Sequence, residues 1–388
     1  MGMHEIIKNC EELYLDIDLS YVKEWKKKTG SKAVGFLPVY VPREFIHAAG
    51  MLPVGLLGCG SHLDIIKGDA FFQSYICQIP RSTIELAVTK RLDCIDGFLF
   101  PAICDVIRNL SGMFQSIMED KYIKFMDYPQ DFSDELGGTF YQTELRDLMQ
   151  GLSKLSGKEI TMDDLKNSIK IYNENRKVVE ELYQMRSVAP HLVSSYELYI
   201  LMRAGYILEV SEHTQMLRDY MEDAAKNLEN KILRDNVRVV VTGTFCEQPP
   251  LNLIKSLEQS GCYIVDDDWV LSNRYIEGDI ENIDDPIKAL ATVYMNQAVS
   301  CASRYEEKEQ KGKYLLRQIK SRKAEGAIFC APSFCDPALL ERPMLQAVLK
   351  ENKIPYTAIK YAENTGQFQV LKEQAGTFAD SIKLWSEA

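Results

Sequence analysis

The chain has 388 residues, of which 46% are hydrophobic and 26% are charged, and its formal net charge at pH 7 is -11. This length is too great for one hydrophobic core, so we expect two α/β domains with connecting helices. The negative charge and the lack of a basic stripe argue against a general nucleic-acid binder, because duplex affinity depends largely on Lys and Arg neutralising phosphates.

The first residues of the chain and its ten cysteines bear on the cellular compartment in which the protein is expected. The first five residues show no positive stretch followed by an apolar one, so we expect no secretory signal. No run reaches the roughly 18 apolar residues of a membrane span. We therefore expect a cytoplasmic protein, in which thiols stay reduced and cysteines serve burial or metal ligation rather than disulfides.

Residues 1–138 form the first predicted domain, in which strands alternate with helices. Because the strands are uninterrupted apolar runs separated by helices, they predict a mostly parallel sheet covered on both faces. Gly50 is expected to end the first helix. The expected elements, in chain order, are a strand at 32–39, a helix from Pro42 to Ala48, a strand at 52–57, a helix from Cys77 to Thr89, a strand at 97–100, a helix from Asp105 and a strand at 122–126.

Residues 139–235 form a predicted helical connector. The strand pattern disappears from about Tyr141 to Asn230. Apolar residues there keep helical spacing among many charges, which is typical of helices with one buried stripe. The residues of this stripe are Leu165, Ile169, Tyr172 and Val179.

Residues 236–388 form a second predicted α/β domain. The two lobes have the pattern of flavodoxin-like or Rossmann-like sheets and suggest a diverged duplication. Asp266, Asp267 and Asp268 follow a strand, where a solvated turn is favoured over a cation site. The expected elements are a strand from 237, a helix at 251–260, strands at 262–265 and 326–330, a helix after Pro337, a strand near 356–359 and a C-terminal helix.

Three cysteines stand where an apolar strand or turn leads into a helix: Cys77, Cys104 and Cys335. Cys104 and Cys335 each follow a proline-containing turn and precede an aspartate, Asp105 or Asp336. A thiolate at a helix N-terminus is stabilised by the helix dipole and by free N–H groups, so these residues are candidate metal ligands or nucleophiles. Open α/β sheets bind ligands beyond the carboxyl ends of their strands, so the three thiols are expected to face one crevice.

Several chemistries fit this pattern. Three thiolates around one iron–sulfur cluster would leave one iron for water, substrate or another ligand, although the spacing differs from compact ferredoxin motifs. Zinc favours close pairs such as C-x₂-C, which are absent from the sequence. None of the five histidines adjoins these cysteines, which disfavours a Cys–His pair. Ordinary burial also stays open.

The other motifs have more modest interpretations. Cys246 follows a strand and is a candidate fourth ligand or pocket residue, with strand-end packing as the alternative. Asp105 and Asp336 are better interpreted as helix-start residues than as proton carriers. The sequence contains no P-loop and no G-x-G-x-x-G, so the chain itself is not expected to hydrolyse ATP. The remaining cysteines are interpreted as packing residues: Cys10, Cys59, Cys94, Cys262, Cys301 and Cys330.

Five segments resemble the 2-hydroxyacyl-CoA dehydratase and benzoyl-CoA reductase family. Around 74–82 and 100–111 the chain is most similar to the C-type (also called N-type) subunits of the ATP-dependent class I reductase branch. The resemblance covers most of the chain and is weakest in the helical connector. The segments are 36–55, 75–82, 100–110, 334–344 and 363–367.

The resemblance implies a [4Fe-4S] cluster on Cys77, Cys104 and Cys335, in the crevice between the lobes. It implies a homologous second iron–sulfur subunit, ATPase activator subunits with their own cluster, and ferredoxin upstream. The implied reaction is the two-electron dearomatisation of an aromatic acyl-CoA in anaerobic metabolism. Two alternatives stay open: a dehydratase subunit that eliminates water by a radical route, and an electron-relay subunit whose homologous partner holds the substrate.

Overall fold

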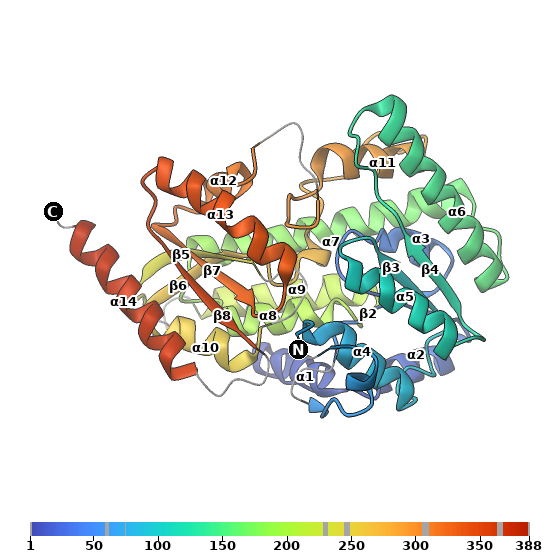
Figure 1. The fold of residues 1–388 in the computed structure, drawn as a ribbon, viewed down its shortest axis with the longest axis horizontal. Coiled ribbons are helices and arrows are strands. Elements are labelled where there is room, and N and C mark those ends of the chain that lie inside the picture. The colour runs from blue at the N-terminus through green and yellow to red at the C-terminus, as the bar shows by residue number, and fades with distance from the viewer. Residues whose placement is uncertain are drawn as a thin grey trace.

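A computed structural model of the chain describes residues 2–58, 62–73, 75–227, 232–243, 249–304, 310–362 and 368–386. The chain forms two four-stranded parallel sheets with helices around them, which confirms the predicted two-lobed α/β fold. In the view of Figure 1 the N-terminal lobe lies to the right and the C-terminal lobe to the left. A long helix, α7 (Met162–Val188), runs behind both.

The N-terminal sheet has the strand order β2-β1-β3-β4. All residues of β1 and β3 are buried, as expected for central strands of a covered parallel sheet. The first strand stops before the predicted position 39, because Pro38 has no N–H to continue the ladder. The elements are β1 (Ala33–Phe36), α3 (Arg43–Ala48), β2 (Leu52–Gly55), α4 (Gln78–Val88), β3 (Gly97–Pro101), α5 (Asp105–Ile117) and β4 (Tyr122–Met126).

The C-terminal sheet has the order β6-β5-β7-β8, which is the same order when each lobe is counted from its own first strand. This shared order supports the predicted duplication. The elements are β5 (Val237–Thr242), α10 (Leu251–Gln259), β6 (Cys262–Asp267), α11 (Pro286–Gln297), α12 (Lys313–Ser321), β7 (Gly326–Pro332), α13 (Asp336–Glu351), β8 (Tyr356–Tyr361) and α14 (Phe368–Ser386).

The chain segment between the last strand of the N-terminal sheet and the first strand of the C-terminal sheet is helical. The predicted buried stripe of α7 is confirmed, since Leu165, Ile169, Tyr172 and Val179 are all buried. Short helical turns occur at Gly68–Ala70, Asp134–Gly138 and Leu271–Asn273. The other helices of this region are α6 (Thr139–Ser156), α8 (Ser195–Ala204) and α9 (Val210–Lys226). None of the described helices has the length and apolar composition of a membrane span.

Two N-terminal helices, α1 (Met3–Leu15) and α2 (Ser20–Thr29), were not predicted. Helix α1 buries Met3, Ile6 and Cys10, and the Met3 backbone N–H donates to the Asp223 carboxylate on α9 over 2.8 Å. The first helix therefore packs on the helical region.

Helix α7 contacts both lobes. Near its start the Ser168 hydroxyl donates to the Glu44 carbonyl oxygen on α3 over 2.8 Å, and near its end Arg186 pairs with Asp267 of β6 over 2.8 Å. Buried apolar side chains from both lobes and from the helices form one continuous core, and a separate, smaller cluster around Val240, Phe329 and Leu349 lies within the C-terminal lobe. The domain boundaries at 138/139 and 235/236 stay a prediction.

The predicted solvated turn at Asp266–Asp268 is wrong for its first two residues. Asp266 and Asp267 are buried, and Asp266 accepts charged hydrogen bonds from Arg274 and Arg322 over 2.8 and 2.7 Å. Burial by itself raises the pKa of Asp266, but the two guanidinium groups outweigh it and hold the pKa at about 2. These aspartates are structural ion-pair partners.

Candidate functional site

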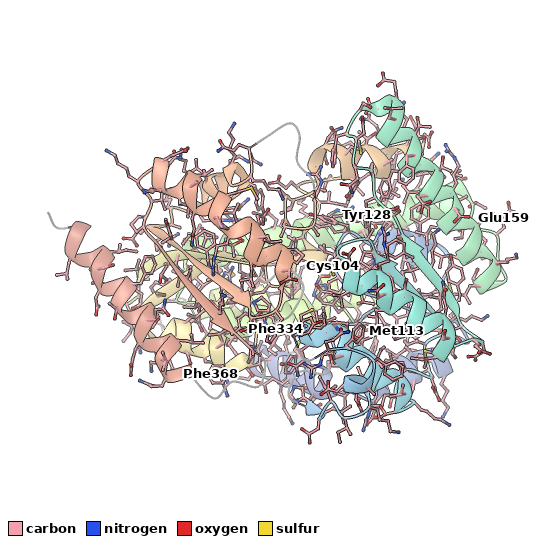
Figure 2. All side chains as sticks on the ribbon, in the orientation of Figure 1. Cys104, Met113, Tyr128, Glu159, Phe334 and Phe368 are labelled. Atoms are coloured by element: carbon pink, nitrogen blue, oxygen red, sulfur yellow. The ribbon has the colours of Figure 1, made fainter. Side chains whose placement is uncertain are left out.

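A cleft of about 510 Å³ is lined by residues of both lobes, and Cys77, Cys104 and Cys335 all line it. Each cysteine is the N-cap residue of a helix: α4, α5 and α13, respectively. Figure 2 shows Cys104 and Phe334, the neighbour of Cys335, where the two lobes meet. The structure thus brings together the three cysteines that the sequence pattern singled out.

The local sequence explains this placement. Strands β3 and β7 are equivalent in the two sheets and end at Pro101 and Pro332, which cannot continue a ladder of hydrogen bonds. The chain then turns and starts a helix with Asp105 or Asp336, whose charge favours the helix N-terminus. The cysteine before each aspartate is therefore held at the carboxyl end of a central strand, next to the point where the strand order reverses.

The charges around Cys104 come from both lobes. Burial raises the pKa of its thiol, and the backbone N–H groups of Ile107 and Val106 lower it without outweighing burial. The carboxylates of Asp105 and of Asp336, which belongs to the other lobe, also raise this pKa. Asp105 and Asp336 both line the cleft, so the two helix starts bring negative charge to it from both lobes.

The cleft wall is largely apolar. Ile103 and Phe334 line it, whereas Phe98 and Phe100 of β3 lie in the core against the ring of Phe114. Further apolar lining comes from Leu37, Ile76, Ile79, Ile107 and Leu340. Besides the cysteines, the polar side chains on the wall are Asp105, Ser303 and Asp336.

One part of the wall was missed by sequence reasoning. Ala302 and Ser303, in the loop after α11, also line the cleft. The Ser303 hydroxyl lies 3.1 Å from the Cys301 sulfur, which in turn lies 3.0 Å from the Tyr40 hydroxyl. No motif marks this loop, because its position depends on contacts with a distant residue of the other lobe.

The other described cysteines behave as packing residues. Cys10, Cys262, Cys301 and Cys330 are buried, and Cys94 is half-buried. Burial raises the pKa of Cys10 to about 12 and that of Cys262 to about 11, so these thiols are unreactive at neutral pH. None of the eight cysteines in the described residues forms a disulfide. Cys246 and Cys59 lie outside the described residues.

The arginines near the cysteine segments show no common anion site. Arg81 pairs with Asp69 over 2.6 Å, and the guanidinium of Arg108 lies over the ring of Phe125, 5.2 Å from its centroid. Arg342 is half-buried on α13.

The three thiol groups are the soft donors on the cleft wall, and thiolates are the usual ligands of iron–sulfur clusters. Across the part of the chain that is described, no three His, Cys, Asp or Glu side chains converge on one ion position. In a cubane each thiolate binds a different iron, so the sulfurs surround a volume rather than a point. Cys77, Cys104 and Cys335 all lie on the wall of one cleft.

Comparisons with known proteins agree along the whole chain. A family profile described as 2-hydroxyglutaryl-CoA dehydratase, D-component, matches residues 38–382. The chain is 55% identical to a benzoyl-CoA reductase subunit of Thauera aromatica over 388 residues, 100% of both chains. It is 28% identical to "(R)-phenyllactyl-CoA dehydratase beta subunit" of Clostridium sporogenes, covering 93% of this chain and 95% of that one. It is 29% identical to "(R)-2-hydroxyglutaryl-CoA dehydratase, subunit beta" of Acidaminococcus fermentans, covering 92% and 94%.

Proposed function

The chain belongs to the 2-hydroxyglutaryl-CoA dehydratase, D-component, family, and we propose that it is the iron–sulfur subunit of the substrate-reducing module of an ATP-dependent benzoyl-CoA reductase. The observation that carries the proposal is the 55% identity over the full length of a benzoyl-CoA reductase subunit, against 28% and 29% for the dehydratase subunits. The chain is accordingly an oxidoreductase subunit.

We propose that Cys77, Cys104 and Cys335 hold a [4Fe-4S] cluster in the cleft that they line. When bound, this group would supply low-potential electrons for the two-electron reduction of an aromatic acyl-CoA. Cys246 stays a candidate fourth ligand or pocket residue.

The side chains around the cleft suit a low-potential centre. Most of the cleft wall is apolar, and a wall of low polarity strengthens the electrostatic interactions beside it. The carboxylates of Asp105 and Asp336 add negative charge, which favours the oxidised form of a redox group there and lowers its reduction potential. The acidic side chains and the apolar wall therefore act in the same direction.

The proposal includes partners and a compartment. The relatives are named as subunits, which supports a partner subunit, and we propose a homologous iron–sulfur subunit. We further propose ATPase activator subunits with their own cluster, ferredoxin as the electron source, and a cytoplasmic location, where thiols stay reduced.

The cluster assignment is tested by iron and sulfide analysis and EPR on anaerobically prepared full-length chain. Single changes Cys77→Ala, Cys104→Ala and Cys335→Ala should each remove most of the iron and the EPR signal, because each deletes one ligand. Cys94→Ala is the matched control, since Cys94 is half-buried and lies away from the cleft lining. Full iron content in any of the three cleft variants would refute that residue's role.

The dehydratase alternative rests on the relatives at 28% and 29% identity. A dehydratase recycles one electron through many turnovers, whereas a reductase consumes two electrons per product. The assembled complex should therefore oxidise two equivalents of reductant per product with benzoyl-CoA. Turnover that continues after the reductant is exhausted would support the dehydratase instead.

A further inference from the structure

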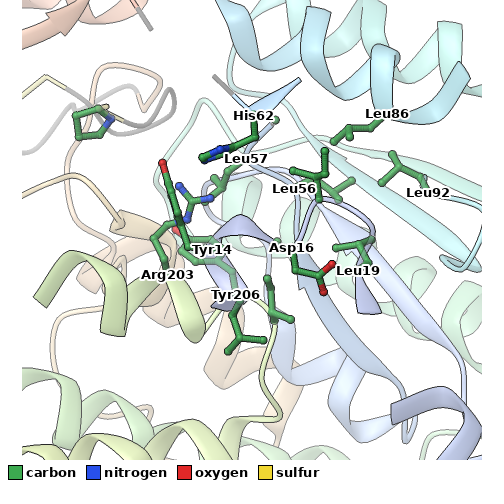
Figure 3. A pocket seen from close by; sticks show the side chains of 16 residues that line it. Tyr14, Asp16, Leu19, Leu56, Leu57, His62, Leu86, Leu92, Arg203 and Tyr206 are labelled. Carbon is green, nitrogen blue, oxygen red and sulfur yellow. The ribbon is translucent and has the colours of Figure 1, made fainter. Parts of the chain in front are cut away.

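A second cavity, of about 70 Å³, shares no lining residue with the cysteine cleft. It lies beyond the carboxyl end of β2, where Gly55, Leu56 and Leu57 form part of its wall, and residues of α1, α4 and the end of α8 close it. Open α/β sheets bind ligands on this side of their strands. Figure 3 shows the cavity from close by.

One end of the cavity holds an arginine without an acidic partner. The Arg203 guanidinium donates one hydrogen bond to the Tyr199 hydroxyl over 2.8 Å and stacks over the ring of Tyr14, 4.8 Å from its centroid. Within the described residues it forms no ion pair with Asp or Glu, and it is no more than partly exposed. A guanidinium stays charged at any working pH, so Arg203 is a cation with no carboxylate partner among the described residues.

His62 adds a second donor at the same end. Its Nε2 atom is buried and has no hydrogen-bond partner within the described residues, and its ring meets that of Tyr14 edge to face, 5.2 Å between centroids. In Figure 3 the side chains of His62 and Arg203 point toward one another. Burial lowers the pKa of His62, and the charge of Arg203 lowers it further, so the neutral ring can present Nε2–H to an acceptor.

The opposite end of the cavity does not neutralise Arg203. Asp16 also lines the cavity but lies away from Arg203 in Figure 3. Its carboxylate accepts hydrogen bonds from the Ser20 backbone N–H over 2.5 Å and from the Ser20 hydroxyl over 3.0 Å, at the start of α2. The apolar lining of the cavity comes from Leu13, Ile17, Leu56, Leu86, Leu92 and Ile207.

We propose that this cavity binds a small carboxylate that carries a short apolar group. The guanidinium of Arg203 offers paired N–H donors that match the two oxygens of a carboxylate, and His62 adds a third donor. The aliphatic wall accepts the apolar group, and the small volume excludes large ligands. This site is independent of the cluster and of the proposed reaction.

The test is calorimetric titration of the full-length chain with acetate, butyrate and benzoate at constant ionic strength in chloride. We expect saturable one-to-one binding, with butyrate about tenfold tighter than acetate because two more methylene groups leave water. Arg203→Met should weaken butyrate binding about tenfold or more, since it removes a charged hydrogen-bond donor. His62→Phe should weaken it less.

Arg203→Lys is a second variant, in case Arg203→Met does not fold. Lysine keeps the positive charge but lacks the paired N–H donors, so this variant should also bind butyrate less tightly than wild type. Arg146→Met, on the exposed face of α6, is the matched control and should bind like wild type. The proposal is overturned if wild type shows no saturable binding of any of the three acids. It is equally overturned if a folded Arg203 variant binds butyrate as tightly as wild type.

Discussion

A buried ion pair joins Arg186 of α7 to Asp267 of the C-terminal lobe. Their side chains are 1% and 0% exposed, and the Arg186 Nη2 and Asp267 Oδ2 atoms lie 2.8 Å apart. The Tyr183 hydroxyl also donates to Asp267 over 3.2 Å, and the Arg186 guanidinium lies over the ring of Tyr183. Two desolvated charges are stable in the interior only as an ion pair, so removing one partner is strongly destabilising.

Asp267→Asn should therefore lower the free energy of unfolding by about 3–5 kcal/mol, because it leaves the buried Arg186 charge without its hydrogen-bonded carboxylate partner. Urea denaturation followed by far-UV circular dichroism measures this. The control is Asp163→Asn, whose side chain is 94% exposed and lies 3.8 Å from Lys166, and it should change stability by less than about 0.5 kcal/mol. Equal effects of the two changes would contradict the argument.

At the residue scale, the sequence was informative where function depends on local context. Cys104 and Cys335 could be predicted as candidate ligands, because the strand, the turn and the helix start around each of them are encoded by adjacent residues. The burial of Asp266 could not be predicted, because its partner Arg322 lies 56 residues away in the sequence. From the sequence alone, a run of three aspartates is expected to be exposed to solvent, because nothing nearby marks the arginine that pairs with it.

At the element scale, His213 connects three helices of the helical region. Its Nε2 lies 3.1 Å from the Leu201 carbonyl oxygen on α8, and its Nδ1 lies 3.0 Å from the Asn175 side-chain nitrogen on α7. Helix α9 carries His213 itself. The neutral ring fits this arrangement, since Nε2–H donates to the carbonyl while Nδ1 accepts from the amide.

Burial lowers the pKa of His213 to about 4, with the Leu201 carbonyl opposing the shift and Arg43 adding to it. In the unfolded chain the pKa of this histidine is about 6.5. Between about pH 4 and about pH 6.5 the imidazole is therefore protonated in the unfolded state but mostly neutral in the folded state. Stability should therefore fall as the pH drops from about 6.5 to about 4, by up to about 1.4 kcal/mol per pH unit. Urea denaturation across this range measures the slope.

His213→Gln is the comparison variant, because its amide nitrogen can still donate to the Leu201 carbonyl but does not titrate. The variant should show a shallower loss of stability across the same range. An unchanged slope would mean that other groups govern the acid response.

Elements were predicted best where apolar runs end in strong turn signals. Strand β4 was expected at 122–126 and lies at Tyr122–Met126. Helix α1 was missed although its buried residues, Met3, Ile6 and Cys10, keep helical spacing. Three apolar positions among polar residues are a weak signal, and α1 is stabilised by packing on α8 and α9 that no local pattern reveals.

At the scale of the whole molecule, buried polar contacts fix the lobes to one another beside the cysteine cleft. The Tyr40 hydroxyl of the N-terminal lobe donates to the Val299 carbonyl oxygen of the C-terminal lobe over 2.7 Å, and Arg43 donates to the Asn273 side-chain oxygen over 2.7 Å. The Tyr40 ring meets those of Tyr275 and Tyr294 edge to face. The sequence predicted two lobes, but these contacts join residues more than 200 positions apart and carry no local signal.

Tyr40→Phe should lower the free energy of unfolding by about 1–3 kcal/mol, because the buried Val299 carbonyl loses its donor while the aromatic packing remains. Tyr75→Phe, with a side chain 65% exposed, is the matched control and should have little effect. Because one continuous core joins the lobes, the change should shift the urea midpoints from tryptophan fluorescence and from circular dichroism by the same amount. If Tyr40→Phe moved only one midpoint, the lobes would be unfolding separately, and the three cysteines would lie on two bodies free to part rather than on one preformed wall.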